Sequence, residues 1–182
     1  MVYSHRIADP SDLPAIVAIY NSTVSSRLVT ADTEPVSVES RRHWFAEHDP
    51  QRRPLWVVDG PADGTSDGAS IGTSADGARQ IIGWLSYSNF YGRPAYSGTA
   101  ELSIYLHEDA RGKGLGRYFL GQAIAFAPQI NVHTLLGFIF GHNTPSLSLF
   151  AAFDFVRWAE LPKVATLDDI ERDLIIVGRR VA

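Results

Sequence analysis

The chain has 182 residues, 45% of them hydrophobic and 20% charged, which is typical of one globular domain with a sizeable core. A net charge of -4 argues against a nucleic-acid binder. Since the chain has no cysteine, disulfides, thiolate metal sites and a cysteine nucleophile are excluded, and a cytoplasmic location is expected. No apolar run has the length of a signal peptide or membrane span, so we expect no membrane partner.

The N-terminal third predicts a strand and two helices. A strand over residues 3–8 precedes a helix that Asp9 caps and Pro10 opens. The buried face of this helix repeats at helical spacing: Leu13, Ile16, Val17 and Tyr20. The polar stretch 21–34 predicts a loop. Ser37 then caps a second helix that reaches about residue 48, with Val38, Phe45 and Trp44 directed inward.

The middle of the chain predicts three strands. Those over 55–59 and 81–90 pair across the Gly/Ala/Ser/Asp-rich stretch 60–80, which we interpret as a flexible hairpin insertion. An aromatic loop that contains arginine, 91–98, leads into the central strand 100–107. Loops at strand ends often carry binding residues, although an ordinary surface loop is the alternative.

A glycine-rich turn follows the central strand. Residues 111–116 read R-G-K-G-L-G, and the helix predicted over 117–127 stops at Pro128. Glycines let the backbone approach a ligand closely, and the first helical N–H groups add unpaired donors and partial positive charge. Arg111, Lys113 and Arg117 add full charge, so the turn favours a pyrophosphate. The alternative is a turn that only caps a helix.

The C-terminal third predicts a buried strand over 132–140, a helix opened by Asn143, and strands over 155–161 and 172–180 separated by a loop, 162–169. The predicted order is β-α-α-β-β-β-α-β-α-β-β. It corresponds to a single α/β domain over residues 1–182, built around a mixed, mostly antiparallel sheet with about four helices.

The spacing of the glycines restricts the class of ligand that the turn can bind. The turn has neither the G-x-x-x-x-G-K-[ST] of a P-loop nor the G-x-G-x-x-G and following acidic residue of a dinucleotide site. Its form, R-G-x-G-x-G/A between a strand and a helix, resembles the acyl-CoA signature of the GCN5-related N-acetyltransferase (GNAT) family. The chain is similar to the phosphinothricin or methionine-sulfone acetyltransferase branch of that family in six segments: 9–16, 19–21, 34–37, 93–96, 101–116 and 143–146.

The resemblance implies a fold whose central strands splay apart to hold the pantetheine arm of acetyl-CoA. The arm would pair with the backbone of Ile104, Tyr105 and Leu106, and Asn143 and Ser146 would support it. The diphosphate would rest on the turn, whose implied ligands are Arg111, Gly112, Lys113, Gly114, Leu115, Gly116 and Arg117. For Asn143, a plain helix N-cap is the alternative.

Glu101 is the candidate general base. A carboxylate between apolar Ala100 and Leu102 is not expected for packing. Strand alternation puts Glu101, Ser103 and Tyr105 on one face, and partial burial would raise the pKa of Glu101 toward the useful range. The alternative is a structural carboxylate paired with an arginine.

The chain departs from the family at the general acid. Many relatives place a Tyr or His on the helix after Asn-x-x-Ser, where this chain has Phe150, which cannot donate a proton. His142 is a substitute, although a surface histidine is the expected alternative.

By the same resemblance, the acceptor pocket would include Phe90, Tyr91, Arg93 and Tyr96 together with Glu101, and Arg93 would pair with an acceptor carboxylate. Tyr20, Asn21 and the loop 27–34 would close its other side. The implied activity is direct transfer of acetyl from acetyl-CoA to the amine of a small amino-acid-like acceptor, without a metal, in a homodimer. The alternatives are an acyl-CoA-binding sensor or partner module, and an acetyltransferase for a protein N-terminus.

Overall fold

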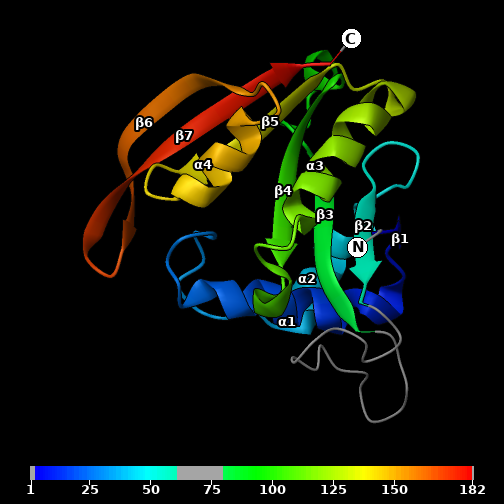
Figure 1. The fold of residues 1–182 in the computed structure, drawn as a ribbon, viewed down its shortest axis with the longest axis horizontal. Coiled ribbons are helices and arrows are strands. Elements are labelled where there is room, and N and C mark those ends of the chain that lie inside the picture. Colours follow the sequence, from blue (N-terminus) through cyan, green and yellow to red (C-terminus); the bar gives the residue numbers. More distant parts are fainter. Residues whose placement is uncertain (1–2, 61–79, 182) are drawn as a thin grey trace.

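A computed structural model describes residues 3–60 and 80–181 (Figure 1). Seven strands form one sheet in the order β1-β2-β3-β4-β5-β7-β6. All neighbours are antiparallel except β4 and β5, which run parallel. The predicted mixed, mostly antiparallel α/β fold is therefore confirmed. The predicted insertion, 60–80, lies outside the described residues except for its ends, where the Gly60 amide donates to the Gln80 carbonyl at 2.7 Å.

The strands of the first half are β1 (His5–Ile7), β2 (Leu55–Asp59), β3 (Ile81–Asn89) and β4 (Thr99–Leu106). The second half has β5 (Thr134–Phe140), β6 (Val156–Leu167) and β7 (Ile170–Arg180). The helices are α1 (Leu13–Val24), α2 (Val38–Ala46), α3 (Leu115–Phe126) and α4 (Thr144–Ala151). Among the described helices, none has the length and apolar character needed to cross a membrane.

The helices cover the two faces of the sheet separately. On one face, Leu115, Phe119 and Leu120 of α3 and Phe150 of α4 pack in a large core with the inward residues of β3, β4 and β5. On the other, Ile16 and Ile19 of α1 pack with Val57 and Trp84, and Trp44 and Phe45 of α2 pack against them. Figure 1 shows α3 and α4 in front of the sheet. The strand alternation predicted for residues 100–106 is confirmed, because Ala100 and Leu102 belong to the α3 side.

Three predicted boundaries are wrong. α1 continues to Val24, because Thr23 and Val24 are buried and the Thr23 hydroxyl bonds back to the Tyr20 carbonyl at 2.7 Å. α3 begins at Leu115 rather than residue 117, since the Leu115 side chain lies in the core. The predicted loop 162–169 is strand through Leu167.

The long β6–β7 hairpin explains the third error. Asp168 and Asp169, the two residues between the strands, both have positive φ, as a tight two-residue hairpin turn of type I′ requires. Pro162 lies where the β6–β7 register shifts, and β6 is an edge strand, so the missing N–H of proline does not break the pairing. Read locally, Pro and two Asp residues indicate a loop, but pairing with β7 overrides that signal.

Candidate functional site

The parallel pairing of β4 with β5 is short. It covers three residue pairs, the last of them Glu101 with Leu136, although β4 continues to Leu106 and β5 to Phe140. Beyond Glu101 the two strands diverge, and the backbone of β4 loses its partner on that side. Unpaired backbone N–H and C=O groups need hydrogen bonds. The divergence confirms the predicted splay and leaves backbone groups in the stretch 104–106 without a strand partner on the β5 side.

The glycine turn lies at the end of β4 and carries two residues in the left-handed region. Gly112 has φ +70° and Gly114 has φ +87°, and a Cβ on either would meet nothing within 4 Å. Gly114 is also the N-cap of α3. Gly116 differs, because a Cβ there would come within 3.1 Å of Leu149 on α4. Thus Gly112 and Gly114 shape an open turn, and Gly116 lets two helices pack.

The three predicted basic side chains surround this turn. Arg111, Lys113 and Arg117 are all exposed. Arg117 lies over the Phe153 ring, with 5.3 Å from its guanidinium carbon to the ring centroid. Within residues 3–60 and 80–181, none of the three forms an ion pair. Open amides at a helix N-terminus, together with exposed cations, fit a diphosphate.

The N-terminal segment holds the turn in place, which the sequence did not predict. The Tyr3 hydroxyl donates to the Lys113 carbonyl at 2.8 Å. The Tyr3 ring contacts Tyr118 on α3, and the hydroxyl of Tyr118 lies 2.8 Å from His5 Nδ1. Because a trans peptide is planar with its C=O and N–H opposed, fixing the Lys113 carbonyl also fixes the direction of the Gly114 N–H.

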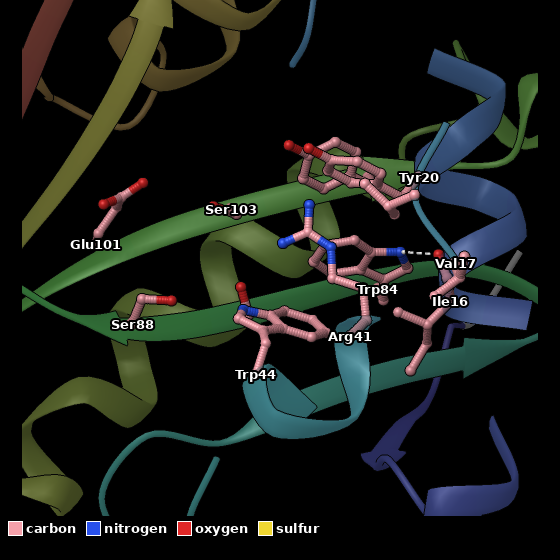
Figure 2. Close-up of a pocket in the computed structure, with 12 residues that line it drawn as sticks. Ile16, Val17, Tyr20, Arg41, Trp44, Trp84, Ser88, Glu101 and Ser103 are labelled. Atoms are coloured by element: carbon pink, nitrogen blue, oxygen red, sulfur yellow. Dashed lines mark hydrogen bonds between the residues drawn. The ribbon is translucent and has the colours of Figure 1, made fainter. Parts of the chain in front are cut away.

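A pocket of about 210 Å³ opens on the other face of the sheet, lined by residues from β3, β4, α1 and α2 and by Val36 (Figure 2). Its floor consists of three cross-strand pairs: Ser88 with Glu101, Ser86 with Ser103, and Trp84 with Tyr105. Successive pairs on one face lie about 7 Å apart. The remaining lining residues are Ile16, Val17, Tyr20, Val36, Arg41 and Trp44. The pocket therefore runs from a polar end at Glu101 to an aromatic end at Tyr105.

Glu101 stands at the polar end, directly where β4 leaves β5. Burial raises the pKa of its carboxyl above the ordinary value of 4.5. Among the described residues the carboxylate has no salt bridge within 4 Å, so the alternative of a structural pair with arginine lacks support. A desolvated carboxyl beside a cleft is the arrangement expected of a general base.

At the aromatic end, the rings pack directly against one another. The rings of Trp84 and Tyr105 stack with centroids 4.4 Å apart, and Tyr20 contacts Tyr105 at 5.0 Å. Arg41 lies over the Tyr20 ring and donates to Asp32 at 2.7 Å. The sequence placed Tyr20 at the acceptor pocket and Ser103 on the same strand face as Glu101, but it indicated Trp44 only as a packing residue. It gave no sign that Arg41, Trp84, Ser86 and Ser88 join this pocket, because only strand and helix pairing brings them together.

Asn143 and Ser146, at the start of α4, lie beside the gap between the diverging strands β4 and β5, which we call the splay. The Asn143 amide oxygen accepts from the Ser146 backbone N–H at 3.1 Å, and its nitrogen donates to the Leu28 carbonyl at 3.0 Å. Asn143 is thus an N-cap and also ties the loop after α1 to α4. One amide hydrogen and one lone pair remain for a ligand. His142, instead of being a free surface group, lies with Nε2 2.8 Å from the Arg27 carbonyl.

Phe150 is a core residue. It is 5% exposed and packs on Phe155, and a Cβ on Gly137 of β5 would come within 2.8 Å of its ring. Its place in α4 is therefore explained by packing.

The predicted acceptor loop forms its own cluster. Phe90, Tyr91 and Tyr96 contact one another, Phe90 also approaches Phe138 of β5, and Arg93 is exposed. None of the four belongs to the lining of the 210 Å³ pocket. Buried Arg53 holds the end of this loop, since it donates to the carbonyls of Ser97 at 2.7 Å and Thr99 at 3.2 Å. The loop lies at the strand end next to Glu101.

Comparison with known proteins identifies the group to which this geometry corresponds. Residues 6–156 match the model of the Acetyltransferase (GNAT) domain. The chain is 45% identical over 177 residues, 97% of it and 98% of the relative, to the Bacillus subtilis (strain 168) protein named "Putative phosphinothricin acetyltransferase YwnH".

Two further similarities extend over most of the chain. The chain is 30% identical over 164 residues, covering 90% of it and 86% of the relative, to the L-methionine sulfoximine/L-methionine sulfone acetyltransferase of Pseudomonas aeruginosa (strain PAO1). Its fold matches, with a TM-score of 0.84 and 24% identity, a GNAT superfamily phosphinothricin acetyltransferase from Sinorhizobium meliloti in complex with AcCoA, covering all of this chain and 90% of the other.

Proposed function

Because this chain belongs to the GNAT family and is an acetyl-CoA-dependent N-acetyltransferase, we propose that it acetylates the amine of a small amino-acid-like acceptor. The observation that carries the proposal is the position of Glu101. Its desolvated carboxylate lies at one end of a pocket and at the point where β4 and β5 part. A donor in the splay and an acceptor in the pocket would meet there.

The donor side uses the splay and the turn. The amides of residues 112–116 and the side chains of Arg111, Lys113 and Arg117 bind the diphosphate of acetyl-CoA. The backbone of residues 104–106 pairs with the pantetheine arm, and Asn143 and Ser146 support it from α4. The open Cβ sides of Gly112 and Gly114 and the exposed cations around them support this assignment.

The acceptor side uses the pocket. The amine points toward Glu101 and the body of the acceptor lies along Ser86, Ser103 and the aromatic end. The loop with Phe90, Tyr91, Arg93 and Tyr96 forms the rim, where Arg93 pairs with the acceptor carboxylate.

Glu101 removes the proton from the ammonium form of the acceptor, directly or through water. An α-amine has a pKa near 8, so part of it is already neutral at pH 7. The amine nitrogen attacks the thioester carbonyl carbon, a backbone N–H near Tyr105 or Leu106 stabilises the oxyanion, and the C–S bond breaks. The leaving thiol resembles cysteine, whose pKa is near 8.5, so its departure needs little assistance from an acid.

The homodimer and the cytoplasmic location are also part of this proposal. Exposed apolar side chains on the β6–β7 hairpin support the homodimer: Val156, Trp158, Val164 and Ile170. Light scattering should then give twice the 20.0 kDa chain mass.

The experiment is a thiol-release assay with acetyl-CoA and a panel of amino acids, methionine sulfone, phosphinothricin and short peptides. Acetylation of at least one free amino acid, identified by mass, is expected. Acetylation of peptides alone would favour the N-terminus acetyltransferase. Tight CoA binding without turnover of any acceptor would contradict the proposal and favour the acyl-CoA sensor.

A further inference from the structure

A buried arginine lies beside the predicted acceptor loop without an acidic partner. Arg53, two residues before β2, is 7% exposed. Among residues 3–60 and 80–181 it forms no ion pair within 4 Å, and its Nε has no hydrogen-bond partner. Burying a charge without a counter-ion costs stability, and burial lowers the pKa of this guanidinium. Packing alone does not explain such a group, so its role depends on what its other N–H groups bind.

The guanidinium of Arg53 binds backbone carbonyls at the start of β4. Its Nη2 donates to the carbonyls of Ser97 and Thr99, at 2.7 Å and 3.2 Å. The pairing of β3 with β4 ends at Asn89 and Ala100, so both carbonyls lie beyond the last pair. Backbone carbonyls away from water need donors. Arg53 supplies the donors that a longer strand would otherwise supply.

The backbone between these two carbonyls is held from the other side. The carbonyl of Gly98 accepts from the N–H groups of His133 and Thr134, at 2.9 Å and 3.1 Å, where β5 begins. A Cβ on Gly98 would come within 2.1 Å of the His133 ring, so the segment lies directly against this ring. Three consecutive carbonyls are therefore bound, and residues 97–99 are fixed relative to the sheet.

A single helical turn connects this fixed segment to the acceptor loop. It is a 3₁₀ turn that begins after Arg93 and ends at Tyr96. The Tyr96 N–H donates to the Arg93 carbonyl at 2.9 Å. The Ser97 N–H donates to the Pro94 carbonyl at 3.1 Å. Arg93, which is exposed, is thus linked to Ser97 by a hydrogen-bonded turn, and the bonds from Arg53 hold the base of that turn.

We propose that Arg53 is a positioning residue of the acceptor side, which holds the loop 91–98 so that Arg93 reaches the acceptor carboxylate. The inference rests on the proposed function, in which this loop forms the rim. Arg53 does not line the 210 Å³ pocket, and Glu101 is held separately by its own pairs on β3 and β5. The role of Arg53 therefore concerns acceptor binding, and neither CoA binding nor proton transfer depends on it.

The test measures steady-state kinetics with methionine sulfone at saturating acetyl-CoA, and CoA affinity by calorimetry. Arg53→Met frees both carbonyls. The KM for methionine sulfone should then rise roughly tenfold, the scale of losing hydrogen bonds to a charged group, while kcat and CoA affinity stay within about twofold. Arg53→Lys, whose ammonium can donate to both carbonyls, should restore the KM to within about threefold of the natural value. Arg52→Met, at an exposed neighbour, is the matched control and should leave the KM unchanged.

Arg93→Ala tests whether the effect passes through the rim. Alone it should raise the same KM, and adding Arg53→Met should then raise it by less than about twofold more, because residues that act through one contact are not additive. Full additivity of the two losses would overturn the inference, as would an unchanged KM in folded Arg53→Met.

If Arg53→Met does not fold, Arg53→Gln replaces it. Glutamine keeps a polar group in the buried site but is neutral and too short to bridge both carbonyls, so the KM should rise in the same way, and an unchanged KM would overturn the inference. In each of these cases the proposed acetyltransferase remains. Failure of the natural chain to acetylate any amino acid would instead overturn the proposed function, and with it the rim that Arg53 holds.

Discussion

Glu101, the proposed general base, would serve catalysis at a cost to stability. It lies on a strand between two core residues, and its partner on β3 is Ser88 rather than a cation. Because none of the described residues forms an ion pair with it, burial raises its pKa. Such a carboxyl takes a proton from an amine more readily than an exposed one does.

Glu101→Gln should lower kcat about 100-fold near pH 7, a typical contribution of a general base. The loss should shrink as the pH approaches the pKa of the free amine, near 8, because less proton removal is then needed. The measurement is a pH–rate profile with saturating acetyl-CoA. If the profile of the Glu101→Gln enzyme parallels the natural one at every pH, Glu101 is not the base.

The same variant should be more stable than the natural chain at neutral pH, although it is less active. A carboxyl whose pKa is raised on folding favours the native state most at low pH, and this stabilisation is lost as the pH rises from the unfolded value, near 4.5, through the folded pKa. Glu101→Gln should therefore raise the melting temperature at pH 7 and lose that advantage near pH 4. Destabilisation at pH 7 would mean that the carboxylate has a structural partner.

Tyr3 contacts the proposed donor site from outside it. Its bond to the Lys113 carbonyl orients the turn, and one such bond contributes about 0.5–1.5 kcal/mol. Tyr3→Phe should therefore weaken CoA binding roughly 2- to 10-fold and leave kcat and the acceptor KM unchanged. Calorimetry with CoA measures the effect, and S-acetylpantetheine, which lacks the diphosphate, should show none. Tyr118→Phe, in the same cluster but bonded to His5, is the control; an equal loss of CoA affinity there would contradict the assignment to Tyr3.

At the scale of elements, the glycine turn combines two requirements. The left-handed backbone at Gly112 and Gly114 turns the chain from β4 into α3, and the missing Cβ atoms leave the concave side open. Either property alone would occur in many surface turns. Together with the N-terminus of a 12-residue helix, they form the diphosphate site that we propose.

Gly114→Ala should destabilise the fold by about 1–2 kcal/mol, the usual cost of a left-handed residue with a side chain, and should also weaken CoA binding by more than tenfold. Gly92→Ala is the matched control. Gly92 has φ +61°, and a Cβ there would likewise meet nothing within 4 Å, but it lies in the 91–98 loop, so only stability should change. Denaturant unfolding and calorimetry separate the two effects. Normal CoA affinity in the Gly114→Ala variant would contradict the turn assignment.

At the scale of the whole molecule, the proposed donor site joins the two halves of the sheet. The turn and β4 belong to the first half, and Asn143 and Ser146 to the second. The loop after α1 already bridges them, through Leu28 to Asn143 and through Arg27 to Asp168 at 2.8 Å. A ligand between the halves adds contacts that only the folded chain can make.

CoA at about 100 times its dissociation constant should stabilise the fold by about 2.7 kcal/mol, which corresponds to a rise of roughly 5–11 °C in melting temperature for a chain of this size. Differential scanning fluorimetry measures the shift. S-acetylpantetheine at the same concentration should produce a smaller rise, because it does not reach the turn. Equal shifts from both ligands would show that the diphosphate is not recognised.

Most of the elements, and the family, could be predicted from the sequence because their signals are local. Alternation along residues 100–106 put Glu101 on the face opposite to Leu102. Ser37 and Asn143 predicted the starts of two helices, because their side chains can cap a helix N-terminus. The turn was recognisable because its glycines and basic residues are consecutive in the chain. Each of these features depends on φ and on neighbours a few residues away.

The tertiary structure alone decided which residues join the Glu101 face of β4 to form the pocket. Trp84 lies opposite Tyr105 through strand register, Arg41 reaches Asp32 from a helix, and Tyr3 reaches Lys113 across 110 positions. The β6–β7 hairpin likewise overrode a local loop signal. Such contacts arise from the pairing of distant segments, whose register is fixed by the packing of the whole core and leaves no mark within any single stretch of sequence.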